Sequence, residues 1–310
     1  KPTAITGGEF NGKVINNSHI LGGTFHGEVD NTTMGTIEKG TFKNSVENKG
    51  MIENGAFHDA VKNNGIINDG AFNDKVENNS TINDGAFNGK VENTASGTIN
   101  DGTFHKAVEN DGIIENGTFH DEVKNNGIIN DGAFNGKVEN NKAIKGGTFN
   151  GEVENRGPGT IKDGTFNGAV ENNGMIENGA FHKAVENNGI INDGAFHDKV
   201  ENNSTINDGA FNGKVENTAS GTINDGMFHK AVENDGIIEK GTFNDAVKNN
   251  NTINDGTFNG KVENNGTIEN GTFHDAVKNN GIINGGTFNG AVTDNGTISG
   301  SITGSGTLNG

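Results

Sequence analysis

The stretch STINDGAFNGKVENTASGTINDG occupies residues 80–102 and recurs letter for letter at residues 204–226. It belongs to a repeat that runs through the chain. All nineteen Phe fall in one series, from Phe10 to Phe288, spaced by 15 residues and at four places by 17. A Val follows each Phe by four residues, and an Ile precedes each Phe by five. Such periodicity predicts a repeat architecture, in which each repeat buries its apolar residues only by stacking on its neighbours.

The repeat has the consensus GTFNG-KVENN-GTIND, and its composition excludes helix because Gly recurs every few residues among Asn and β-branched residues. The segment TFNGKV alternates polar and apolar residues, which predicts one strand with Phe and Val on the same face. The pieces ENNG and NDG are typical of turns. We therefore expect an all-β fold, a parallel β-solenoid with Phe, Val and Ile ladders inside.

Three pentads per repeat favour a three-sided rung of 15 residues, whereas a rung of two repeats, about 30 residues, remains the alternative. We expect a continuous solenoid over residues 1–293 and a divergent C-terminal rung or cap over 294–310, which is uncharged after Asp294. Representative members of the expected interior ladders are Phe72, Phe87, Phe104, Val76, Val91, Val108, Ile82, Ile99 and Ile114.

The charge and residue types restrict function. A net charge of −18 with a single Arg argues against nucleic-acid binding, which needs basic patches. No apolar run approaches the ~20 residues that cross a membrane, so we expect no membrane insertion. The absence of Cys excludes disulfides and thiol chemistry. Every carboxylate has many copies, and there is no Ser-His-Asp set or phosphate loop, so we expect no enzyme.

The pentads are similar to those of pentapeptide-repeat proteins, but KVENN carries Glu at its centre where that family has a bulky residue, so this family is rejected. The chain more loosely resembles the Gly- and Asn-rich short-period β-solenoid repeats of bacterial surface and fibre proteins. The architecture and this resemblance favour an extracellular or cell-surface structural protein: a rigid rod that self-assembles into, or forms part of, a filament, sheath or fibre. The alternative is an adhesin or ligand-binding solenoid that holds a glycan, or ice, on repeated surface rows.

Eight of the nine His directly follow a Phe, in a slot that should face solvent. Two pairs on successive rungs, His105 with His120 and His182 with His197, should lie about 5 Å apart and are candidate metal ligands. The alternative is a solvated row in which His and Asn substitute freely. We expect no cofactor.

Glu dominates the slot after Val and is followed by Asn, which predicts an exposed charged row that keeps the chain soluble. Lysines such as Lys62, Lys75 and Lys90 offset the charge of this row. Loose Ca²⁺ binding by the Glu and Asn oxygens is the alternative.

The slot before the core Ile holds Thr in some repeats and an apolar residue in others. A contiguous apolar stripe on a surface marks an interface, although a half-covered corner would look the same in sequence. We expect the chain itself as partner, through end-to-end or lateral assembly, and surface glycans under the alternative function. The candidate lateral interface comprises Ile66, Ile113, Ile128, Ile190, Ile237 and Ile282.

Overall fold

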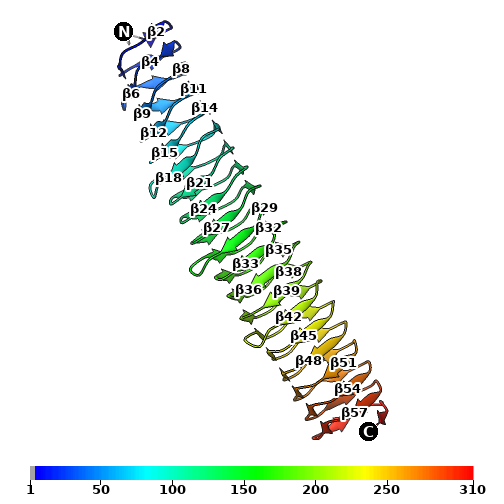
Figure 1. Ribbon diagram of the computed structural model, residues 1–310. Helices are drawn as coiled ribbons and strands as arrows, with labels where there is room; N and C mark the ends of the chain where they lie inside the picture. Colours follow the sequence, from blue (N-terminus) through cyan, green and yellow to red (C-terminus); the bar gives the residue numbers. More distant parts are fainter. Residues whose placement is uncertain (1–3, 310) are drawn as a thin grey trace. The chain divides into compact units, whose positions relative to one another are not determined.

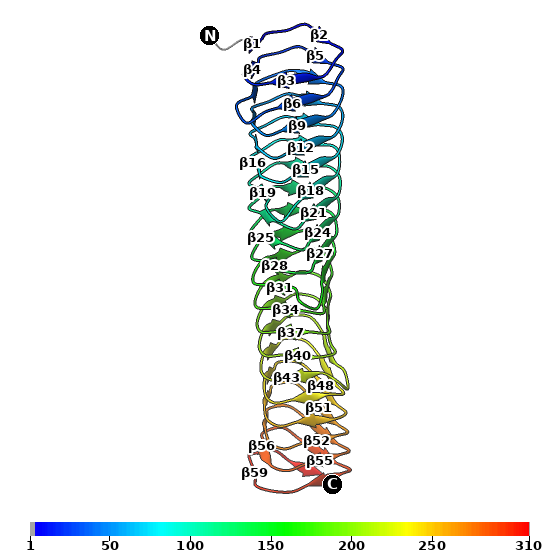
Figure 2. The ribbon, with the colours of Figure 1, turned by 90° about the vertical axis from the view of Figure 1, so that its left-hand side faces the viewer.

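A computed structural model of the chain describes residues 4–309, which fold as short parallel strands joined by turns. The chain divides into two compact units, unit 1 (Lys1–Glu152) and unit 2 (Val153–Gly310). In each unit one repeat makes one three-sided turn, so that strands of the same sheet lie over one another (Figures 1 and 2). The predicted β-solenoid and its 15-residue rung are confirmed, and the 30-residue rung is wrong. Among the residues described, no helix is long and apolar enough to cross a membrane.

Sheet A consists of two-residue strands that each end in a core Ile. In unit 1 they are β1 (Ala4–Ile5), β4 (His19–Ile20), β7 (Thr36–Ile37), β10 (Met51–Ile52), β13 (Ile66–Ile67), β16 (Thr81–Ile82), β19 (Thr98–Ile99), β22 (Ile113–Ile114), β25 (Ile128–Ile129) and β28 (Ala143–Ile144). In unit 2 they are β31 (Thr160–Ile161), β34 (Met175–Ile176), β37 (Ile190–Ile191), β40 (Thr205–Ile206), β43 (Thr222–Ile223), β46 (Ile237–Ile238), β49 (Thr252–Ile253), β52 (Thr267–Ile268), β55 (Ile282–Ile283) and β58 (Thr297–Ile298).

Sheet B consists of short strands that end in the core Phe, except for the last. In unit 1 they are β2 (Glu9–Phe10), β5 (Thr24–Phe25), β8 (Thr41–Phe42), β11 (Ala56–Phe57), β14 (Ala71–Phe72), β17 (Ala86–Phe87), β20 (Thr103–Phe104), β23 (Thr118–Phe119), β26 (Ala133–Phe134) and β29 (Thr148–Phe149). In unit 2 they are β32 (Thr165–Phe166), β35 (Ala180–Phe181), β38 (Ala195–Phe196), β41 (Ala210–Phe211), β44 (Met227–Phe228), β47 (Thr242–Phe243), β50 (Thr257–Phe258), β53 (Thr272–Phe273), β56 (Gly286–Phe288) and β59 (Ile302–Thr303).

Sheet C consists mainly of three-residue strands that start at the core Val. In unit 1 they are β3 (Val14–Asn16), β6 (Val29–Asn31), β9 (Val46–Asn48), β12 (Val61–Asn63), β15 (Val76–Asn78), β18 (Val91–Asn93), β21 (Val108–Asn110), β24 (Val123–Asn125) and β27 (Val138–Asn140). In unit 2 they are β30 (Val153–Asn155), β33 (Val170–Asn172), β36 (Val185–Asn187), β39 (Val200–Asn202), β42 (Val215–Asn217), β45 (Val232–Asn234), β48 (Val247–Asn249), β51 (Val262–Asn264), β54 (Val277–Asn279), β57 (Val292–Asp294) and β60 (Leu308–Asn309).

The segment TFNGKV is not one strand, so that prediction was wrong. In the repeat at Phe87, β17 ends at the Phe and β18 starts at Val91, and the two strands belong to different sheets. The Asn-Gly pair between them forms a corner, because this residue pair tolerates the backbone bend better than it extends a strand. Phe and Val both reach the interior, but from two sides of the rung.

The interior consists of aligned columns of identical side chains. Parallel pairing in register sets Phe72 on Phe87 and Ile67 on Ile82, and the same holds from rung to rung within each unit. Neighbouring Phe rings stack with centroids 4.7–4.9 Å apart and nearly parallel planes. The nine representative core residues are all buried: Phe72, Phe87, Phe104, Val76, Val91, Val108, Ile82, Ile99 and Ile114.

A fourth column, which we call the asparagine ladder, is polar and was not predicted. From β3 to β54, the Asn that ends each sheet-C strand points inward, and these eighteen residues are buried. In the middle of unit 1, the Asn63 side chain donates to Asn78 Oδ1 over 2.8 Å and to the Thr81 carbonyl over 3.1 Å. Its own Oδ1 accepts from Asn48 Nδ2 over 2.8 Å. The ladder thus joins each rung to the next and ties sheet C to sheet A, which satisfies the buried amides.

The last described rung, at β58, β59 and β60, differs from the others. Strands β58, β59 and β60 pair with β55, β56 and β57, but Gly304 replaces the Phe that the register would place on Phe288. A hollow of 140 Å³ forms there, lined in part by Phe288, Ile302 and Leu308. Asp294 ends the described asparagine ladder and accepts from Asn279 Nδ2 over 2.7 Å. Gly310 lies outside the described residues.

Candidate functional site

The histidine slot lies on the surface, directly after each core Phe, and all eight of its histidines are exposed. The ring centroids of His105 and His120 are 5.0 Å apart, and those of His182 and His197 are 4.9 Å apart, with stacked planes. Within residues 4–309, no group of three or more His, Cys, Asp or Glu could hold a metal ion. Each histidine pair therefore offers at most two nitrogen ligands, and a further ligand would have to come from outside the protein.

The charged row on sheet C is a network of ion pairs. In unit 1, Lys75 Nζ lies 2.6 Å from Glu92, and Lys90 Nζ lies 2.9 Å from Glu109 on the next rung. In unit 2, Lys199 Nζ lies 2.6 Å from Glu216. Hydrogen bonding to Lys75 lowers the pKa of Glu92, and hydrogen bonding to Lys199 lowers the pKa of Glu216. The row therefore repels itself much less than its Glu content alone would suggest.

The slot before Val determines whether this surface is covered. Where the slot holds Lys, as at Lys199 and Lys214, the side chain pairs with Glu of its own and the next rung, and the underlying Val is fully buried. Where it holds Ala, no long side chain crosses the Val, although the Val is still buried, with Val232 and Val247 each 2% exposed. Unit 2 has such a stretch at Ala231, Ala246, Ala276 and Ala291.

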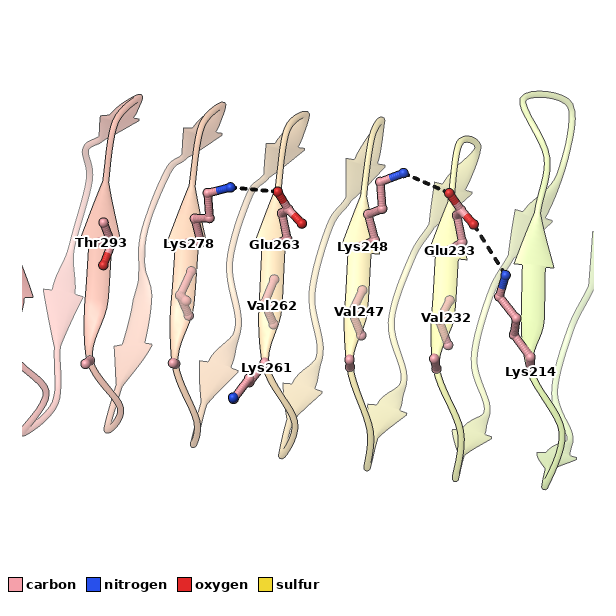
Figure 3. A pocket seen from close by; sticks show the side chains of 15 residues that line it. Lys214, Val232, Glu233, Val247, Lys248, Lys261, Val262, Glu263, Lys278 and Thr293 are labelled. Carbon is pink, nitrogen blue, oxygen red and sulfur yellow. Dashed lines mark hydrogen bonds and ion pairs between the residues drawn. The ribbon is translucent and has the colours of Figure 1, made fainter.

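The Ala stretch forms a depression of about 460 Å³, which we call the sheet-C hollow. It is lined by Ala and Val, with Lys and Glu along its edges (Figure 3). Lys248 reaches Glu233, and Lys278 reaches Glu263, each over 2.9 Å. Hydrogen bonding to Lys248 lowers the pKa of Glu233. The Lys261 side chain points away from Glu263, at the opposite edge of the hollow, and forms no ion pair within residues 4–309 (Figure 3).

The apolar slot of sheet A, which we call the sheet-A column, faces outward. Ile66, Ile113, Ile190, Ile237 and Ile282 are exposed by 36–44%, whereas Ile128 is half-buried. The apolar residues have a four-rung pattern. Each two-residue insertion lies at the corner before sheet A, at residues 32–35, 94–97, 156–159 and 218–221, and its rung carries Thr in the column. The next rung carries Met51, Ile113, Met175 or Ile237.

One of these insertions borders a depression in the surface. In unit 1 the corner at 32–35 stands beside the paired column residues Met51 and Ile66, and together they line a depression of about 280 Å³. Met34, on the corner itself, is 80% exposed. Large apolar side chains so exposed, and repeated along one face, are typical of a surface that contacts another molecule.

The asparagine ladder and the sheet-C hollow were both missed from sequence. The ladder left a signal: the second residue after Val is Asn in every repeat except the last, whereas the third varies among Asn, Thr, Lys, Asp and Arg. A polar residue type that does not vary between repeats indicates a buried position. The Asn lies within a turn-like segment, however, and was therefore assigned to the exposed row. The hollow left a weaker signal, the exchange of Lys for Ala before Val. Both features are outcomes of stacking, which brings residues 15 positions apart into contact.

Searches of protein-family models, of curated proteins and of solved structures find nothing that matches this chain.

Proposed function

We propose that the protein is an extracellular structural protein, a stiff β-solenoid element that associates with copies of itself through the sheet-A column. The observation that carries this proposal is a large apolar residue on the rung after each insertion, four rungs apart: Met51, Ile113, Met175 and Ile237. The two Ile are exposed and the two Met are half-buried. A second copy has the same rung step, so the apolar positions of two aligned copies can meet repeatedly. Many weak contacts of equal spacing then add up by avidity.

The scaffold supports a mechanical role. Phe, Ile, Val and Asn columns continue through each unit, and backbone hydrogen bonds join every rung to the next. Since each rung is fixed to its neighbours at all three sides, bending a unit would strain many contacts at once. The proposal therefore assigns the interior to rigidity and the sheet-A column to association.

The test uses residues that the chain itself carries in this column. Ile66→Thr, Ile113→Thr, Ile190→Thr and Ile237→Thr, combined in one variant, copy the natural Thr81 and Thr205 and should leave the fold intact. Sedimentation velocity over a concentration series should show self-association of the wild type, and an onset at about tenfold higher concentration for the variant. A matched control, Ala56→Thr, Ala71→Thr and Ala195→Thr on sheet B, should associate as the wild type does. A wild type that stays monomeric would refute the proposal.

A glycan-binding function is the second candidate, favoured by a row of half-buried and exposed Asn at the corner after the core Ile. Asn83 Nδ2 donates to Asn68 Oδ1, and Asn100 Nδ2 donates to Asn83 Oδ1, both over 2.7 Å. Here the row presents amide groups on three consecutive rungs, at Asn68, Asn83 and Asn100. Saturable binding of an oligosaccharide to the soluble monomer, with no self-association, would favour this function over the first.

A further inference from the structure

The sheet-C hollow has an excess of positive charge in a protein of net charge −18. Four lysines line it against two glutamates. Lys248, Lys261 and Lys278 lie on three consecutive rungs, at both edges of an Ala-lined floor (Figure 3). Lys261 has no acidic partner within the described chain. An acidic group entering the hollow would therefore meet cations on each of three rungs.

The complementary chemistry is present on the same chain, in unit 1. Asp69, Asp84 and Asp101 are exposed, lie on three consecutive rungs and form no ion pair within residues 4–309; we call them the acidic ridge. In each, Oδ1 accepts from the backbone N–H of the following Gly over 2.6–2.8 Å, which fixes the carboxylate at the corner between sheets A and B. Because a Gly follows each Asp, no side chain broadens the corner beside the carboxylate.

We propose that the sheet-C hollow of one copy receives the acidic ridge of a second copy. This inference rests on the proposed function and names a second contact through which that assembly forms. The proposal rests on the opposite charges of the ridge and the hollow, and on the equal spacing of their rungs. The rung step, measured between stacked Phe ring centroids, is 4.8–4.9 Å in the rungs of the ridge and in those of the hollow. One carboxylate of the ridge therefore falls on each rung of the hollow when the two stacks are aligned, between the lysines of its two edges.

The spacing also argues against an extended acidic peptide as the occupant. On one face of a β-strand, side chains recur about every 6.7 Å, and carboxylates so spaced would fall out of step with lysines one rung apart. A second copy has the same fold, so its carboxylates recur at the same rung step as the lysines. Ridge and hollow are different surfaces, so the contact is heterologous, and it propagates into an open assembly unless its rotation closes a ring.

The test compares two variants with a charge control. The hollow variant carries Lys248→Gln, Lys261→Gln and Lys278→Gln. The ridge variant carries Asp69→Asn, Asp84→Asn and Asp101→Asn, and Asn is the natural residue of that slot at Asn54 and Asn116, where Oδ1 accepts from the following Gly in the same way. The control carries Lys106→Gln, Lys183→Gln and Lys230→Gln, three exposed lysines outside the hollow.

Sedimentation velocity at low and at high NaCl is the measurement. The wild type and the control should self-associate, and salt should weaken that association because exposed ion pairs are screened. Each variant alone should self-associate only at about tenfold higher protein concentration, since three exposed pairs together contribute about 1–2 kcal/mol. The association of each variant should no longer depend on salt. Mixing the two variants should restore salt-sensitive association, because one supplies an intact ridge and the other an intact hollow.

Several results would overturn this inference. A hollow variant that associates with the salt dependence of the wild type would remove the hollow from the interface. A hollow variant that is impaired beside an unimpaired ridge variant, or a mixture that fails to associate, would assign the hollow to a different anionic occupant. Loss of the Ile→Thr effect on sheet A, with both charge variants acting as expected, would refute the sheet-A contact alone. A wild type that never associates would refute both proposals.

Discussion

At the scale of single residues, the most consequential position is the buried Asn that ends the sheet-C strands from β3 to β54. An apolar residue there would be buried as easily, but it could not form the hydrogen bonds that the polar groups of the corner need. The Asn63 amide bonds both neighbouring asparagines and the Thr81 carbonyl, and its Oδ1 also accepts from the Gly65 N–H over 3.3 Å. The residue thus closes the turn between two sheets and continues a column of hydrogen bonds at the same time.

Replacing one member of the ladder should be costly. Asn63→Leu keeps the branched shape of the side chain but leaves the polar partners in the two adjacent rungs and at the Thr81 carbonyl without their bonds. We expect the free energy of unfolding to fall by about 3 kcal/mol. Urea unfolding followed by circular dichroism measures it. The neighbouring exposed position provides the control: Asn64→Ala should change stability by less than about 0.5 kcal/mol. Equal effects at the two positions would contradict the structural role of the ladder.

These two asparagines also show what sequence could and could not predict. Phe, Val and Ile each have a slot of their own, so their burial followed from the pattern. Asn63 and Asn64 are the same residue in the same turn-like segment, and only stacking distinguishes them. The sequence-based interpretation placed both outside because Asn and Gly are typical of turns. The exposed candidates His105 and His120 were predicted about 5 Å apart because rung spacing is a property of the backbone.

At the scale of the rung, the two-residue length changes all fall at one corner. All four two-residue insertions lie between sheet C and sheet A. In the second of them, Ala95 and Ser96 are exposed, while the Thr94 hydroxyl donates to the Asn78 carbonyl and the Gly97 N–H to the Thr94 carbonyl. The ladder passes beneath unbroken, with Asn93 Nδ2 donating to Asn110 Oδ1 over 2.7 Å. The insertion therefore changes the surface without changing the stack.

Deleting Ala95 and Ser96 tests this separation. The deletion leaves Asn93, Thr94 and Gly97 in the spacing of an ordinary 15-residue rung such as Asn63–Gly65. We expect the free energy of unfolding to change by less than about 1 kcal/mol, because loop length costs little. The Gly97 N–H loses the Thr94 carbonyl but gains Asn93 Oδ1 as acceptor, as the Gly65 N–H bonds Asn63 Oδ1 in an ordinary rung. Circular dichroism and urea unfolding check it. A loss of several kcal/mol would mean that the inserted corner supports the rung after all.

At the scale of the whole molecule, the surface charge couples stability to pH. Lys75 lowers the pKa of Glu92, Lys199 that of Glu216 and Lys248 that of Glu233. A carboxyl group whose pKa is lower in the folded than in the unfolded state stabilises the fold above its ordinary pKa of 4.5. That stabilisation is lost as the pH falls below 4.5 toward the folded-state pKa. It is modest for each pair, because all three pairs are partly exposed.

The urea concentration at the midpoint of unfolding should therefore stay constant between about pH 5 and 9. It should fall as the pH drops below about 4.5. The variant Lys75→Gln, Lys199→Gln, Lys248→Gln removes the main cause of each lowered pKa. We expect it to be less stable than the wild type at pH 7 and nearly equal to it at pH 3, so that its midpoint changes less with pH. A constant difference between the two proteins across this range would show that the ion pairs do not cause the pH dependence.

The near-identity of successive rungs bears on how the protein would respond to mechanical load. Successive rungs are joined by the same kind of backbone bonds and the same Asn bridge as far as Asp294, where the ladder ends. Neither end of a unit therefore contains a rung that is attached more firmly than the others. A unit pulled from one end would peel in similar small steps, each releasing about 50 Å of extended chain from a 15-residue rung. Work would be absorbed rung by rung rather than in one rupture, which suits a material that must yield without breaking.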